Sequence, residues 1–109
     1  MTQTHLADRI AALRTQFLSE LGAARSELTA LLMRVDQTAP QSDEHKRLLT
    51  LTHSLAGRGG TFGFPDLGNA AAEANTLLES DGPGLPEAAQ ALIGELSRVL
   101  GPAPRAPSE

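Results

Sequence analysis

The stretch LTHSLAGRGGTFGF, residues 51–64, combines a helical leucine pattern with four glycines that follow a single histidine, His53. Glycine inside a helix costs roughly 1 kcal/mol relative to alanine, because it loses more backbone freedom on folding. Gly57 and Gly60 follow His53 by about one and two helical turns, on the same side of the helix. We therefore expect bare backbone beside this imidazole, so that another molecule can approach it closely.

The helix that carries His53 has a clear start and a clear end in the sequence. Ser42 is a typical N-cap, and the acids Asp43 and Glu44 fall in the first turn, where the helix dipole favours negative charge. The glycine pair Gly59-Gly60 is typical of helix termination. These signals predict a helix from about residue 43 to residue 59 or 60.

The leucine period places His53 on the outer side of this helix. At about 100° per residue, one narrow arc holds the core positions, which are Leu48, Leu51, Thr52 and Leu55. Around the helix axis, His53 lies about 140° from Leu48, outside the core arc, which predicts that its ring is exposed. Arg58 points well away from it. The residues expected beside His53 are Lys46, Leu49, Thr50, Ala56, Gly57 and Gly60. Leu49 is interpreted in two ways, as a contact for a docked partner or as a side chain at the bundle edge.

The rest of the chain indicates an all-α protein. Its apolar residues, 40% of 109, are mostly Leu and Ala, whereas β-branched aliphatic residues are rare. Apolar spacing predicts a short first helix with its stripe from Leu6 to Leu21, a bend at Gly22, and a second helix to about Val35. A single continuous helix is the alternative, because the stripe never loses its phase. Further helices should start at Pro65-Asp66 and at Pro86-Glu87, the last one ending at Gly101. We expect an antiparallel up-down four-helix bundle with a short extra N-terminal helix over residues 1–101, and a disordered Pro-rich tail over 102–109.

Composition narrows the classes of function. The chain has no cysteine and a formal net charge of −4, so zinc-thiolate sites and binding to nucleic acid or anionic membranes are not expected. No apolar run approaches the roughly 18 residues of a membrane span, and no signal peptide is evident, so we expect a cytoplasmic monomer. We find no inward His or Glu pairs for a metal or haem. His45 lies about 12 Å along the helix from His53, too far to share a metal with it, and is interpreted as an ordinary surface residue.

An exposed imidazole supports a specific chemistry. The neutral ring has one nitrogen with a free lone pair, which can attack a phosphoryl group in line. Such a transfer depends mainly on positioning and charge stabilisation, which a docked partner carrying Mg²⁺ could supply. The helix itself offers no base, metal or oxyanion hole, so no enzyme activity of its own is expected.

The residues around His53 resemble the signature of the histidine-containing phosphotransfer (HPt) family. The family pattern is His-x-Leu-Lys-Gly, with a glycine ten residues after the histidine and a leucine four residues further on. His53, Leu55, Gly57, Gly63 and Leu67 match these positions. The first-helix segment 13–18 is also similar, and the resemblance spans roughly residues 9–100. One departure is Ala56, where the family usually has a lysine. Another is the pair Ala74-Asn75, where the family commonly has Leu-Glu. We interpret this second departure as a structural difference that does not disable the site.

The resemblance implies a four-helix bundle in which His53 is the phosphoacceptor. Phosphate would come from a receiver aspartate or a (hybrid) histidine kinase and would pass to the receiver domain of a response regulator. The chain itself would hold no cofactor, with Mg²⁺ in the partner receiver domain, and Lys46 would partly replace the missing lysine. The alternative is an adaptor that binds receiver-like partners through the same face without being phosphorylated, which the alanine at position 56 keeps open.

Overall fold

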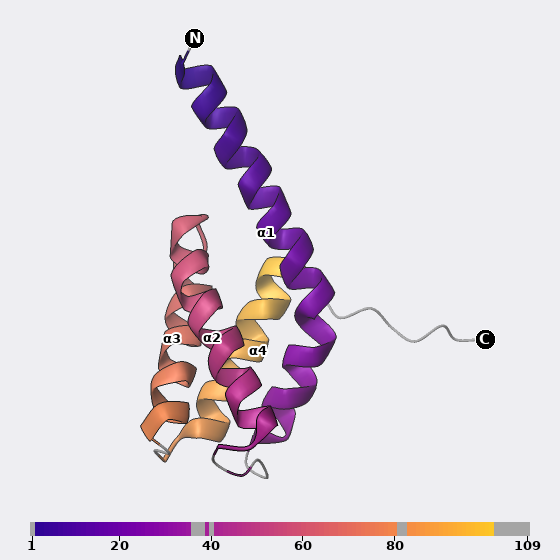
Figure 1. The fold of residues 1–109 in the computed structure, drawn as a ribbon, viewed down its shortest axis with the longest axis vertical. Helices are drawn as coiled ribbons and strands as arrows, with labels where there is room; N and C mark the ends of the chain where they lie inside the picture. Colours follow the sequence, from indigo (N-terminus) through magenta and orange to yellow (C-terminus); the bar gives the residue numbers. More distant parts are fainter. Residues whose placement is uncertain (1, 36–38, 40, 81–82, 102–109) are drawn as a thin grey trace, which may run out of the picture.

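The computed structural model describes residues 2–35, 39, 41–80 and 83–101, with side chains from Leu6 onward inside the first helix. These residues form four helices and no strand: α1 (Thr2–Met33), α2 (Asp43–Thr61), α3 (Pro65–Ser80) and α4 (Leu85–Leu100). Figure 1 shows α2, α3 and α4 beside the lower half of α1. The all-helical expectation is confirmed. The tail expected over 102–109 lies outside the described residues.

The N-terminal part of the chain differs from the expectation. We expected a short helix, a bend at Gly22 and a second helix, but α1 is one uninterrupted helix of 32 residues. A Cβ on Gly22 would meet nothing within 4 Å, so this glycine serves no close contact and its presence does not break the helix. The apolar stripe keeps its phase through Gly22, and packing of the later half of the helix outweighs the modest cost of one glycine.

The upper half of α1 rises beyond the other three helices (Figure 1). Leu6, Ile10 and Leu13, which the sequence placed on a packed helix face, are 59%, 49% and 47% exposed. From Phe17 onward the same stripe is buried. Sequence period identifies an apolar face, but only the lengths of the neighbouring helices decide how much of it is covered.

The core lies between α1, α2, α3 and α4 and is built of leucine and alanine. Burial is nearly complete at Leu48, Leu67, Ala71, Ala74 and Leu92. All three phenylalanines of the chain meet where α1 enters the bundle: the Phe17 ring lies 5.3 Å from Phe62 and 6.1 Å from Phe64. This aromatic contact anchors α1 to the α2–α3 connection.

Three ion pairs join α1 and the residue just after it to α2 along the outside of the bundle. They use positions seven residues apart, 20 and 27 on α1 and 34 directly after its end. The pairs are Glu20–Arg58 at 2.8 Å, Glu27–Arg47 at 2.7 Å and Arg34–Glu44 at 2.8 Å. Arg58 also lies over the Phe17 ring, 4.9 Å from its centre, so it points toward α1, away from the His53 side as expected.

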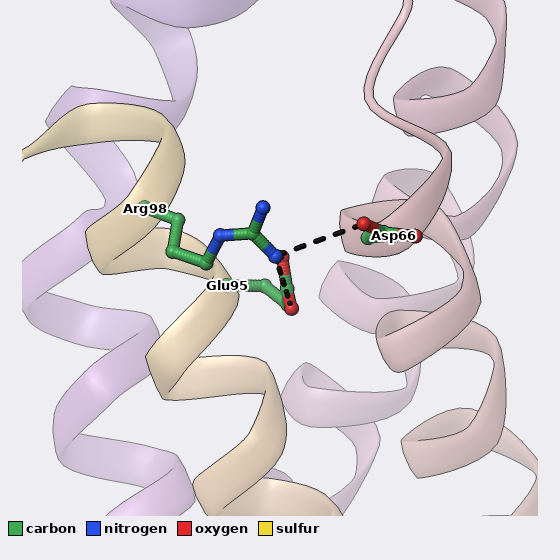
Figure 2. A network of polar contacts seen from close by, with 3 residues as sticks. All are labelled: Asp66, Glu95 and Arg98. Atoms are coloured by element: carbon green, nitrogen blue, oxygen red, sulfur yellow. Dashed lines mark hydrogen bonds and ion pairs between the residues drawn. The ribbon is translucent and has the colours of Figure 1, made fainter.

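A further polar network links the start of α3 to α4 (Figure 2). Arg98 Nη1 lies 3.2 Å from both carboxylate oxygens of Glu95 and 3.7 Å from Asp66 Oδ2. Arg98 and Asp66 are mostly exposed, so this network contributes little to stability. The α3 start at Pro65 agrees with the expected proline at a first helical position.

Candidate functional site

Helix α2 positions the candidate site, and its ends are formed by the expected residues. The Ser42 side chain accepts a hydrogen bond from the His45 amide at 3.1 Å, and Asp43 and Glu44 lie in the first turn. The helix continues one or two residues past the expected end, to Thr61. Gly63 then adopts φ +91°, a left-handed conformation in which other residues are strained.

The buried and exposed faces of α2 are those that the helical period of the sequence predicts. Leu48, Thr52 and Leu55 are buried, and Leu51 is half-buried. His53 is exposed. Among the described residues, none forms a hydrogen bond or ion pair with the His53 ring. Both ring nitrogens are therefore free to meet a partner molecule.

His53 lines a shallow hollow between α2 and α3. The residues around this hollow, here called the His53 hollow, are Leu49, Thr50, His53, Ser54, Asn75 and Glu79. Leu49 is half-buried and packs against the core, as expected of a side chain at the bundle edge, and it also lines the hollow. Its contact with a docked partner stays a prediction. The structure thus brings Leu49, Thr50 and His53 together around one hollow.

Four other residues predicted for the site do not line the His53 hollow: Lys46, Ala56, Gly57 and Gly60. Lys46, Gly57 and Gly60 are exposed, and Ala56 is half-buried against the core. They extend the same face of α2 toward both of its ends. No described carboxylate forms an ion pair with Lys46. Lys46 precedes His53 by about two turns, roughly 10 Å along the axis, which suits long-range attraction better than direct contact.

The glycines of α2 serve two different purposes. A Cβ on Gly59 would lie 2.9 Å from both Cα and N of Gly68, so here glycine allows α2 and α3 to approach closely. The sequence predicted only helix termination at this position. A Cβ on Gly57 or Gly60, by contrast, would meet nothing within 4 Å. The fold does not require glycine at these two positions, and the helix is weakened by having it there.

Asn75 is the residue of the site that sequence reasoning assigned only a structural role. Its Nδ2 donates to the Leu49 carbonyl at 3.0 Å and to Thr52 Oγ1 at 2.9 Å. Thr52 Oγ1 in turn donates to the Leu48 carbonyl at 2.8 Å. The Leu49 carbonyl is also the helical acceptor for the His53 amide, four residues later. Asn75 therefore fixes the turn of α2 from which His53 projects, while its side chain borders the His53 hollow.

His45 is not the ordinary surface residue that the sequence suggested. It is half-buried, and its Nδ1 accepts a hydrogen bond from the Gln41 amide at 3.3 Å. Because Nδ1 accepts, Nε2 carries the proton and donates to the Leu78 carbonyl, 2.9 Å away. His45 thus joins the start of α2 to the last turn of α3. The sequence held no signal for this role, because both partners are backbone groups.

Comparisons with known proteins assign most of the chain to one family. A family model described as "Hpt domain" matches residues 12–101. No curated protein and no solved structure matches the chain. None of the described helices is long and apolar enough to cross a membrane. In the described part of the chain, no three His, Cys, Asp or Glu side chains are grouped as metal ligands would be.

Proposed function

The chain belongs to the Hpt domain family, whose members carry phosphoryl groups on histidine in phosphorelays, and from this premise we propose that His53 is its phosphoacceptor. The observation that carries the proposal is an exposed imidazole, free of hydrogen bonds from the described residues, on a helix face with two glycines that the fold does not require. His53 would accept phosphate from a receiver aspartate or a histidine kinase and pass it to the receiver domain of a response regulator. The antiparallel up-down bundle would hold the ring on a rigid helix, and the protein would act in the cytoplasm with these partners.

The transfer needs few groups from this chain. A ring nitrogen of neutral His53 attacks the phosphorus of an aspartyl phosphate through its lone pair, forming an N–P bond. The P–O bond to the aspartate breaks, and the aspartate leaves as a carboxylate. The other ring nitrogen keeps its proton throughout. The reverse sequence delivers the phosphoryl group to the next aspartate. Mg²⁺ of the receiver would stabilise the charge of the transferring group, and this chain would need no cofactor of its own.

The helix face around His53 would form the docking surface. Leu49, Ala56, Gly57 and Gly60 offer apolar and backbone contact, and Thr50 lies at the edge of the His53 hollow. Because the two glycines have no side chains, a receiver could bring its carboxylates close to the ring. Lys46 would attract the acidic receiver site over a distance.

Phosphotransfer labelling tests the proposal. The chain is incubated with receiver domains charged by labelled acetyl phosphate, or with a histidine kinase and labelled ATP, and is then separated and counted. We expect acid-labile, alkali-stable label on the wild type and none on His53→Gln. A variant that retains only His53, His5→Gln/His45→Gln, should still be labelled, provided that circular dichroism shows it folded.

Two results would contradict the assignment. Equal labelling of His53→Gln and wild type would place the phosphoryl group elsewhere. Tight binding of a charged receiver without any label would favour the alternative of a non-phosphorylated adaptor that uses the same face, an alternative that rests on the alanine at position 56.

A further inference from the structure

The His53 hollow brings one carboxylate to the candidate phosphoacceptor. Of the residues that line it, only His53 and Glu79 are ionisable. Glu79 lies in the last turn of α3, is exposed, and forms no ion pair with a described residue. The C-terminal end of a helix dipole is negative, so a carboxylate there does not stabilise α3. The fold therefore gives no reason for a negative charge at this position.

Helices α2 and α3 run in opposite directions where they form the hollow. Gly59, near the end of α2, lies against Gly68, near the start of α3. Thr52, earlier in α2, bonds to Asn75, later in α3. In a helix the Cα–Cβ bonds tilt toward the N-terminus, so side chains on the two helices lean in opposite directions along the face that they share.

His53 and Glu79 lean toward each other. His53 leans toward Leu49 and Thr50, one turn before it in α2. Glu79 leans toward Asn75, one turn before it in α3. The Asn75 amide donates to the Leu49 carbonyl at 3.0 Å, so these two turns lie side by side. A phosphoryl group on the His53 ring would therefore share the hollow with the Glu79 carboxylate.

No cation among the described residues lines the hollow to offset this negative charge. Helix α3 contains neither lysine nor arginine. On α2, Arg47 and Arg58 form ion pairs with glutamates of α1. Lys46 lies about two turns, roughly 10 Å, from His53 along the axis, and position 56 holds alanine. A phosphoryl group in the hollow would thus have a carboxylate as its nearest charged neighbour from this chain.

We propose that the Glu79 carboxylate destabilises phosphorylated His53, so that phosphate passes on to a receiver instead of accumulating on this chain. This inference rests on the proposed role of His53 as phosphoacceptor. A phosphoryl group adds about two negative charges near neutral pH. Repulsion by Glu79 raises the free energy of the phosphorylated chain only. The unphosphorylated chain and the aspartyl phosphate of the separate receiver are unaffected.

Transfer to the receiver removes this repulsion. A carboxylate oxygen of the receiver aspartate attacks phosphorus and forms a P–O bond. The N–P bond breaks, its electron pair returns to the ring nitrogen of His53, and the other ring nitrogen keeps its proton. The step carries the phosphoryl charge out of the hollow, and the reverse step brings it back. Glu79 therefore shifts the equilibrium toward the receiver without itself touching the reacting atoms.

The equilibrium of phosphotransfer tests the role of Glu79. The full chain, labelled by a charged receiver and purified, is mixed with the same receiver, uncharged, and Mg²⁺. The ratio of label on the two proteins is read at its plateau, with released phosphate counted separately. At about 20 mM salt, Glu79→Gln should keep about three- to tenfold more label relative to the receiver than wild type does. Glu79→Asp retains the charge and should stay within about twofold of wild type. The matched control Glu73→Gln removes an exposed α3 carboxylate outside the hollow and should behave as wild type.

Salt distinguishes an effect of charge from an effect of packing. Exposed charges are screened at about 0.5 M salt, so the difference between Glu79→Gln and wild type should fall below about twofold there. A difference that does not shrink with salt, or a Glu79→Gln variant that keeps no more label than Glu73→Gln, would overturn the role of Glu79 and leave His53 as the phosphoacceptor. If neither the wild type nor any variant takes up label, the proposed function itself fails, and this inference fails with it.

Discussion

The Asn75 side-chain amide donates a 2.9 Å hydrogen bond to the hydroxyl of Thr52, the residue directly before His53. Thr52 is 0% exposed, and its hydroxyl is satisfied by this bond together with its own donation to the Leu48 carbonyl. The pair connects α3 to the one turn of α2 that presents the candidate phosphoacceptor. A buried polar bond of this kind positions the turn more specifically than leucine packing alone could.

Asn75→Ala should therefore destabilise the protein by roughly 1–3 kcal/mol, because it leaves the buried Thr52 hydroxyl and the Leu49 carbonyl short of a donor. Thr76→Ala, an exposed neighbour on α3, is the control and should stay within about 0.5 kcal/mol of wild type. Urea denaturation measures both. Equal midpoints for the two variants would show that the bond contributes nothing.

The two kinds of glycine in α2 predict opposite stability changes. Gly59→Ala forces a Cβ to within 2.9 Å of the Gly68 backbone and should cost about 1–3 kcal/mol as the helices separate. Gly57→Ala enters open space and should stabilise the helix by roughly 0.5–1 kcal/mol. Denaturation midpoints at unchanged m-values provide the measurement. A stabilising Gly59→Ala would contradict the close helix contact.

Gly57→Gln tests whether a receiver docks on this face, without disturbing the fold. Its side chain would extend into the open space one turn from His53, so the fold should persist while a receiver is held back from the ring. We expect phosphotransfer to fall about tenfold or more, because small displacements of reacting groups are costly in rate. Gly94→Gln on α4, also a glycine with open space, is the matched control and should transfer normally. Transfer at the wild-type rate in Gly57→Gln would remove this glycine from the docking surface.

The ion pair of Glu27 with Arg47 predicts a dependence of stability on pH. Hydrogen bonding from the Arg47 guanidinium holds the pKa of the Glu27 carboxyl below its ordinary value of 4.5. The folded state thus binds the proton less readily than the unfolded state. The resulting stabilisation is present above pH 4.5 and is lost as the pH falls through the lowered pKa. Glu27→Gln should lose less stability than wild type between about pH 6 and pH 3 in urea denaturation. Glu73→Gln, which removes an exposed glutamate without an ion pair among the described residues, should follow the wild-type curve.

Ala56→Lys tests the departure from the family pattern. Ala56 is half-buried, so a lysine stem could lie along the helix surface and bring its ammonium group toward a phosphoryl group on His53. One such charge pair in water is worth about 1 kcal/mol, which corresponds to roughly a fivefold longer phosphohistidine lifetime. The lifetime is measured by decay of the label, with Ala91→Lys on α4 as the control. An unchanged lifetime would show that a cation at this position has no role in this chain.

The sequence by itself determined the bounds of α2 and the starts of α3 and α4 to within one or two residues, and the exposure of His53. Helix capping is a local property, so Ser42, Gly63 and Pro65 marked the ends of helices. The spacing of apolar residues is local too, and it was enough to place His53 outside the core. The glycines at 57 and 60 were also correctly assigned to an open face.

Only the tertiary structure decided how these helices pack against one another. The bend at Gly22 was wrong, because a helix with a continuous apolar stripe tolerates one glycine. The exposure of Leu6 depends on where the neighbouring helices stop, and the contact of Gly59 with Gly68 depends on how closely two helices cross. Asn75 and His45 bond to groups 23 to 33 residues away. The spacing of apolar residues cannot predict hydrogen bonds between residues so far apart in the sequence, because the packing of the helices decides which residues meet.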